Sequence, residues 1–160
     1  MCLKYIDTET KRVRELIGKT SKNTKVFYKL YEVVKAFDAQ GNPKLKLYSP
    51  YMNNYTINKP GDIVSNRSSK NMYGTEELTH NIDRGIHVFE TGNGVQKELL
   101  FFNRVWKDKC YVSVAVQCSL KDFVAAGYFQ RHESSVFMKV KITPQTWKKL
   151  EKQLLPQSKE

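Results

Sequence analysis

The chain has 160 residues, of which 40% are hydrophobic and 27% are charged, and its formal net charge is +11. This balance excludes a fully disordered chain, and the length suits one domain with a single core. We therefore expect residues 1–160 to form a single α+β domain, in which a mainly antiparallel sheet with an N-terminal β meander is packed by two or three helices.

The N-terminal segment, residues 1–23, is basic and contains one short predicted helix. Apolar residues recur at helical spacing within residues 8–17, and Gly18 would end this helix. Residues 24–37 are rich in β-branched and aromatic side chains and predict a long strand. Because this strand is apolar on both faces, we expect it in the centre of a sheet. One face carries Val26, Tyr28 and Leu30, and the other carries Phe27, Tyr31 and Val33.

Turn residues divide the next part of the chain into short strands. Residues 38–44 contain Gly, Asn and Pro and predict a hairpin loop, whose partner strand would be residues 45–50. The Lys-Pro-Gly-Asp sequence at residues 59–62 predicts a tight turn between strands at 55–58 and 62–64. These strands together would form the β meander.

The middle of the chain combines a long loop with the clearest periodic segments. Residues 65–85 are polar and show little periodicity, which predicts a binding loop or a loop that covers a site. A short strand is expected at residues 86–89. Apolar residues recur at helical intervals in residues 95–106, so we expect a helix packed on the sheet. Clean alternation in residues 111–118 predicts a strand.

The last part of the chain predicts two helices and one strand. The sequence Ser-Leu-Lys-Asp resembles a capping box, which favours a helix over residues 120–127. Apolar residues alternate over residues 136–142 and predict a strand. Thr143 is a suitable N-cap for a final helix over residues 144–154, and residues 156–160 form a tail.

Cysteine and histidine spacing gives no sign of a metal site or a disulfide framework. The cysteines are Cys2, Cys110 and Cys118, and we place the last two at the ends of a buried strand.

No apolar run reaches the roughly 18 residues of a membrane span, and the first residues lack the apolar stretch of a secretory signal. We expect a cytoplasmic protein of a host cell cytosol, with no membrane partner, no metal and no cofactor.

The positive charge points to an anionic partner, such as a nucleotide, a nucleic acid or an acidic protein surface. Basic residues are scattered along the chain, which favours a folded basic face or pocket over a basic tail. Tyrosines in the first half alternate with Lys, Asn and Ser, and rings beside cations are suited to stacking a base and neutralising its phosphate. Solubility and strand propensity explain the same two patterns without a ligand.

Two segments, LYSPYMNNYTINKPG and DRGIHVFET, resemble a loose group of uncharacterised phage, bacterial and large-virus proteins. The similarity covers about residues 26–100. It implies a small phage accessory protein, of a kind that counters host defence by sequestering a cyclic or ADP-ribose-type nucleotide in a basic, Tyr-lined pocket. The expected ligand-binding residues are Tyr28, Lys29, Ser49, Tyr51, Tyr55, Arg67, Arg84 and His87.

Two other functions remain open. The protein could be a basic inhibitor, similar to an anti-CRISPR protein, that binds a host defence protein or nucleic acid, and exposed aromatic and Arg anchors would favour a protein partner. Residues 85–89 also resemble the central strand of ADP-ribosyltransferases. However, Tyr73, Gly74 and Thr75 lie too close to this strand to serve as the upstream motif of that family, so we expect no enzyme and no catalytic residues. A homo-oligomer is compatible with either function.

Overall fold

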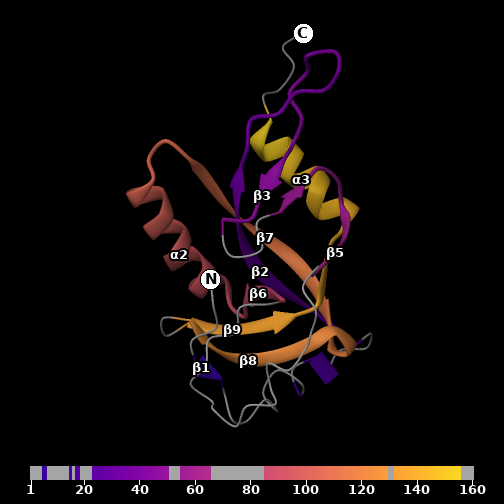
Figure 1. The fold of residues 1–160 in the computed structure, drawn as a ribbon, viewed down its shortest axis with the longest axis vertical. Coiled ribbons are helices and arrows are strands. Elements are labelled where there is room, and N and C mark those ends of the chain that lie inside the picture. The colour runs from indigo at the N-terminus through magenta and orange to yellow at the C-terminus, as the bar shows by residue number, and fades with distance from the viewer. Residues whose placement is uncertain are drawn as a thin grey trace.

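The computed structural model describes residues 5–6, 15, 17–18, 23–50, 55–65, 85–129 and 132–155. These residues form an α+β structure with one mainly antiparallel sheet, as the sequence predicts (Figure 1). Its elements in chain order are β1 (Tyr5–Ile6), β2 (Thr24–Val33), β3 (Leu47–Tyr48), β4 (Thr56–Ile57), β5 (Gly61–Val64), β6 (Ile86–Phe89), α2 (Gly92–Val105), β7 (Cys110–Ser119), the 3-10 helix η1 (Leu120–Asp122), β8 (Phe123–Phe129), β9 (His132–Phe137), β10 (Lys139–Ile142) and α3 (Pro144–Leu154).

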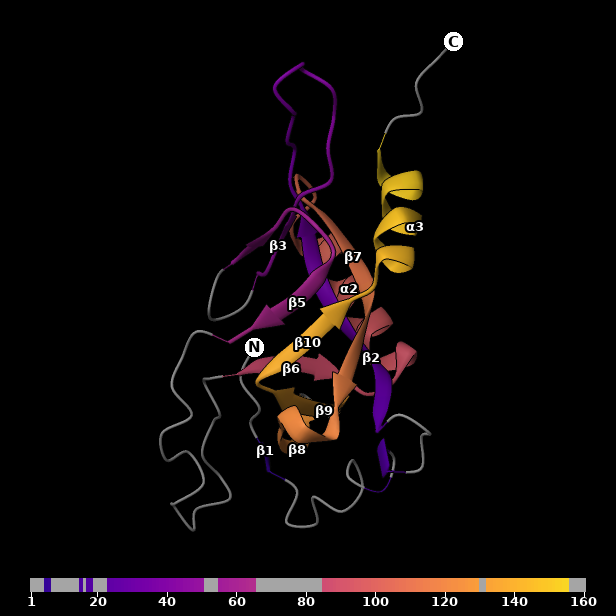
Figure 2. The ribbon, with the colours of Figure 1, turned by 90° about the vertical axis from the view of Figure 1, so that its right-hand side faces the viewer.

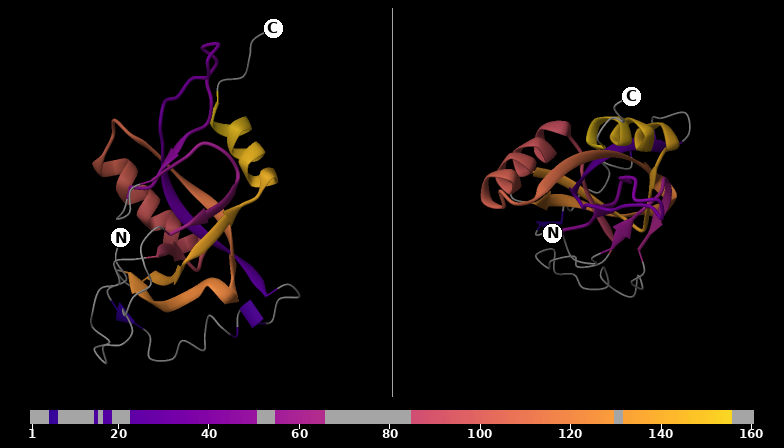
Figure 3. Two further views of the ribbon diagram at one scale, coloured as in Figure 1. Left: turned by 45° about the vertical axis from the view of Figure 1, so that its right-hand side comes forward. Right: turned by 90° about the horizontal axis from the view of Figure 1, so that it is seen from above.

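The sheet is built around the long antiparallel pair of β2 and β7, which are in register from Thr24 opposite Ser119 to Val33 opposite Cys110. The strand order is β1-β8-β9-β6-β2-β7-β10-β5, and β3 and β4 branch from the end of β2. β2 therefore lies between β6 and β7, which confirms the central position predicted from its two apolar faces. The sheet curves around one face, which we call the inner face (Figure 3).

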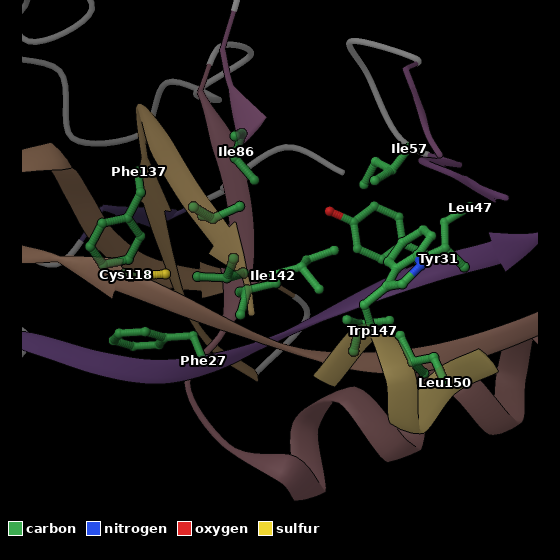
Figure 4. Close-up of a cluster of buried hydrophobic side chains, with 14 of the residues drawn as sticks. Phe27, Tyr31, Leu47, Ile57, Ile86, Cys118, Phe137, Ile142, Trp147 and Leu150 are labelled. Atoms are coloured by element: carbon green, nitrogen blue, oxygen red, sulfur yellow. The ribbon is translucent and has the colours of Figure 1, made fainter. Parts of the chain in front are cut away.

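The main core fills the inner face. Phe27 and Tyr31 of β2 meet apolar residues from β6, β7, β9 and β10, and all are buried (Figure 4). Helix α3 follows β10 directly and lies along one end of the sheet, where Trp147 and Leu150 join this core (Figure 2). Thr143 caps α3 as predicted, since its Oγ1 accepts a hydrogen bond from Thr146 N at 3.2 Å.

The outer face of the sheet is covered by α2. Val95, with the partly buried Leu99 and Phe102, packs on Leu30 of β2 and on other residues of a second buried cluster, Phe89 and Tyr111. The helix begins at Gly92, three residues before the predicted start, because Thr91 Oγ1 accepts a hydrogen bond from Gly94 N at 3.1 Å. None of the described helices is long and apolar enough to cross a membrane.

The prediction of a helix at residues 120–127 is wrong. Only η1 is helical, and the Ser119 side chain makes no capping hydrogen bond to it. From Phe123 onward the chain forms β8, which pairs with β9. Aromatic and β-branched residues suit a sheet, and the Phe123 ring packs 5.7 Å from the ring of Phe137, so tertiary packing overrides the local helix signal.

Three further differences concern strand pairing and burial. β2, β3 and β4 pair in succession as predicted, but β5 pairs with β10, and no pairing with β4 is found among the described residues. The single strand predicted at residues 136–142 is divided by a bend at Met138, whose main chain bonds Asp122 and Ser65. Cys118 is buried in β7, but Cys110 at the other end is exposed.

Within the predicted helix at residues 8–17, Glu15 and Ile17 are helical, as is Gly18, and the remainder lies outside the described residues.

Candidate ligand-binding cleft

A cleft of about 650 Å³ opens where β4 and β5 face the start of β6. Its walls are formed by residues 55–65 and by Gly85 and Ile86. Polar groups are supplied by Tyr55, Asn58, Lys59, Asp62 and Ser65, and the rest of the lining is largely apolar. This size and this mixture of groups are typical of sites for small molecules.

Behind the cleft lies a pair of tyrosines that touch through their hydroxyls. The Tyr55 and Tyr31 hydroxyl oxygens are 2.9 Å apart, and their rings meet edge to face. Figure 4 shows the Tyr31 hydroxyl directed toward the side of the core where Ile57 and Ile86 lie, and both isoleucines line the cleft. Burial raises the pKa of Tyr55 to about 12 and that of Tyr31 well above its ordinary value, so both phenols stay neutral at physiological pH.

Lys29 is buried on the same inner face, between Phe27 and Tyr31 along β2, and is only 3% exposed. Its Nζ donates a hydrogen bond to the His87 carbonyl oxygen at 3.2 Å and lies 5.6 Å from the centroid of the Tyr31 ring. Burial lowers the pKa of this amine from 10.5 to about 7. A buried titratable group beside a cleft is a reason to suspect a functional site.

Ser49, the residue after β3, lies next to Tyr55. Its backbone N–H donates a hydrogen bond to the Tyr55 carbonyl oxygen at 3.0 Å, which fixes Tyr55 against the core. The Ser49 hydroxyl is buried and makes no hydrogen bond of ordinary geometry to the described residues. The inner face therefore holds three hydroxyls and one amine next to the cleft.

The structure brings together four of the residues predicted from the sequence. Lys29, Ser49 and Tyr55 contribute side chains, and His87 contributes its carbonyl oxygen. Tyr28 lies on the outer face with the α2 cluster, away from the cleft. The other three predicted residues, Tyr51, Arg67 and Arg84, lie outside the described residues.

Sequence reasoning missed Tyr31, Lys59 and Ser65 as members of the site. Tyr31 was available from strand alternation, since residues two apart in a strand share a face and Lys29 was already a candidate. Lys59 and Ser65 had no such signal, because only the tertiary approach of β5 to the start of β6 makes them part of a cleft.

Glu90 follows β6 directly and is a carboxylate that could support chemistry. The Glu90 carboxylate is buried and accepts a hydrogen bond from Ser135 Oγ at 3.1 Å. Among the residues that the structure describes, no three His, Cys, Asp or Glu side chains gather as a metal site would require.

Comparison of the chain with family models, with curated proteins and with solved structures found no match.

Gly85 at the edge of the cleft is expected to be intolerant of a side chain. Its φ is +77°, and an added Cβ would lie 2.5 Å from Val136 Cγ1 and 3.3 Å from the Phe137 carbonyl oxygen. We expect Gly85→Ala to reduce the free energy of unfolding by about 2 kcal/mol, through backbone strain and steric conflict. Urea denaturation measures this. Gly92→Ala is the matched control, because a Cβ there meets open space, and equal losses in both variants would contradict the geometry at Gly85.

Proposed function

We propose that the protein binds a small anionic ligand of the nucleotide class in the cleft beside Tyr55, and holds it without changing it chemically. The observation that carries this proposal is the cleft itself, whose lining includes Tyr55 and Lys59 together with one carboxylate, Asp62. An aromatic ring and a lysine are the groups that a base and a phosphate need. Lys29 is not part of the cleft lining, but its amine lies 5.6 Å from the ring centroid of Tyr31, whose hydroxyl meets that of Tyr55.

The state of Lys29 fits an anion site better than a purely structural position. A buried amine whose pKa is about 7 gains a proton readily when a negative charge approaches. Ligand binding would then take up a proton, and the new positive charge would stabilise the bound anion. The net charge of +11 also raises the local concentration of anions around the chain.

The biological role that we propose is sequestration. The resemblance to phage accessory proteins would make the ligand a cyclic or ADP-ribose-type messenger of a host defence system. We assign no catalytic step, because the Glu90 carboxylate accepts a hydrogen bond from Ser135 and the His87 side chain, between the inner-face residues Ile86 and Val88, points away from the inner face. Tight binding alone is enough to remove a messenger from solution.

Thermal denaturation with a cyclic dinucleotide, a cyclic trinucleotide and ADP-ribose tests this function. A ligand at about 100 times its Kd stabilises a protein by about 2.7 kcal/mol, which corresponds to an increase of about 5–10 °C in Tm for a chain of this size. We expect one of the three to give such a shift, and we expect Lys59→Glu to reduce it. Lys44→Glu is the control, since it makes the same charge change at an exposed position outside the cleft.

Tyrosine variants separate the cleft from the outer face of the sheet. Tyr55→Phe should reduce the ligand shift, whereas Tyr28→Phe on the outer face should leave it unchanged. If none of the three ligands raises Tm, or if the shift is the same in Lys59→Glu and Lys44→Glu, the cleft is not the site. Binding to oligonucleotides that weakens steeply with salt would indicate a nucleic-acid partner instead.

A further inference from the structure

Helix α2 and the residue that follows it leave four large apolar side chains exposed near the C-terminal end of the helix. Leu100 is 69% exposed, Phe101 45%, Val105 49% and Trp106 40%, and we call these four residues the α2 ridge. A surface helix normally presents polar residues outward, and a contiguous exposed apolar patch marks an interaction site. Figure 3 shows α2 at the periphery of the molecule, and none of the other described helices or strands covers its outer side.

The ridge is held rigid by aromatic packing that reaches the outer core. The Trp106 ring packs 5.0 Å from the ring of Phe102, and Phe102 packs 5.0 Å from the ring of Tyr111 in β7. Phe101 contacts Phe102 and Trp106 edge to face. Side chains that are already fixed lose little entropy when a partner binds, so this arrangement is preorganised for contact.

Positive charge accompanies the ridge. Arg104 lies over the Phe101 ring at 5.9 Å, and Lys97 lies almost two turns earlier on the same side of the helix. Among the described residues, neither cation forms an ion pair. Two copies of the chain that met through this surface would bring like charges together, so the complementary surface is acidic.

We propose that the α2 ridge docks an amphipathic helix of a partner protein, whose apolar face is flanked by Asp or Glu. Phe101 and Val105 are four residues apart, and so are Leu100 and Arg104, and such rows form the ridges that pack into the grooves of another helix. Aromatic residues and Arg are also the side chains that most often carry binding energy in protein interfaces. This surface lies on the outer face, apart from the cleft, so docking here goes beyond the proposed ligand binding.

A bilayer fits the ridge less well than a helix does. Membrane-binding helices keep their cations beside the apolar face, where the head groups lie. Here Arg104 lies opposite the buried side of α2, between Leu100 and Phe101 around the helix, so insertion of the apolar side chains would carry the guanidinium with them. A carboxylate on a partner helix can meet Arg104 at that position.

Two synthetic helical peptides test the proposal on the full chain. They share one apolar face of leucines and differ only in having Glu or Lys at the flanking positions. Fluorescence polarisation should show that the Glu peptide binds at least about tenfold more tightly than the Lys peptide, because complementary charge selects the partner. Arg104→Glu and Leu100→Ser should each weaken the Glu peptide by about tenfold, and Lys148→Glu on α3 is the control of equal charge change.

Each alternative occupant gives a different result. Equal binding of both peptides, or no binding at millimolar concentration, overturns the proposal. Arg104-dependent binding to phosphatidylcholine–phosphatidylserine vesicles without binding of the Glu peptide would identify a membrane surface. A dimer on gel filtration that Leu100→Ser dissociates, again without peptide binding, would identify a second copy of the chain. Circular dichroism of every variant confirms that the exposed substitutions leave the fold intact.

Discussion

Replacing Lys29 by methionine is expected to stabilise the protein by about 3 kcal/mol at pH 7. In the unfolded chain the amine is charged, and in the folded chain burial lowers its pKa to about 7, which opposes folding by about 4 kcal/mol at 1.36 kcal/mol per pKa unit. Methionine has a similar length and no charge. It forgoes the hydrogen bond to the His87 carbonyl, worth about 1 kcal/mol, so most of the gain remains.

The stabilisation by Lys29→Met should decrease as the pH rises above 7. Because the pKa of Lys29 is lower in the folded state, the unfolded chain binds more protons between pH 7 and about 10.5, and this group makes the wild type more stable as pH rises. The difference between Lys29→Met and wild type should therefore shrink by about 1.5 kcal/mol between pH 7 and pH 8.5. At higher pH the raised pKa values of Cys118, Tyr31 and Tyr55 act in the opposite direction in both proteins.

Urea denaturation at pH 7 and pH 8.5 measures both effects. Lys44→Met is the control, since the same substitution at an exposed position should change stability by less than about 0.5 kcal/mol at either pH. A destabilised Lys29→Met protein with an unchanged pH dependence would show that the amine is charged and stabilised in the native state. Under the proposed function, the stabilised variant should also lose ligand-induced protection, since natural proteins retain such strain mainly at functional sites.

Removal of the Phe137 ring is expected to destabilise the protein by about 4 kcal/mol, the usual loss for a fully buried phenylalanine. Phe137 is completely buried, and its ring lies 5.2 Å from that of Phe27 and 5.7 Å from that of Phe123. This aromatic cluster joins β2 to β8 and β9, so Phe137→Ala leaves a cavity where the two parts of the sheet meet.

Guanidinium denaturation measures the free energy of unfolding of Phe137→Ala and of its control, Phe37→Ala. Phe37 is 62% exposed, so the same truncation there should have little effect. If Phe137→Ala does not fold, Phe137→Leu, which should lose about 1–2 kcal/mol, brings the measurement into range. A loss below about 1 kcal/mol in Phe137→Ala would mean that the three rings do not form a common core.

Sequence patterns predicted the elements whose signals are local. Alternation along β2 and β7 reports directly which residues face the core, and Thr143 with Pro144 fixes the start of α3. The cap-like sequence before Phe123 was misleading because the same residues also suit a strand, and pairing with β9 decides between them. β5 was placed beside β4 because the chain connects them closely, whereas its actual partner is β10 from the far end of the chain.

In the site, too, single residues could be predicted from the sequence, but contacts between distant segments could not. Lys29 was expected in the site from the resemblance to the phage proteins, and the structure shows its amine buried and hydrogen-bonded to the His87 carbonyl. The cleft was not predictable, because it depends on how β5 meets the start of β6. The α2 ridge did leave a local signal, since four consecutive apolar residues, Leu99 to Phe102, cannot all face one side of a helix.

The pairing of β2 with β7 has a consequence for biosynthesis. β2 is translated early, but the strand that covers its whole length comes from the second half of the chain. Until the ribosome has released β7, the hydrophobic edge of β2 has no lasting partner, and such nascent edges are prone to aggregate. Yield in cells should therefore depend on chaperones and on translation speed more than the stability of the finished fold would suggest.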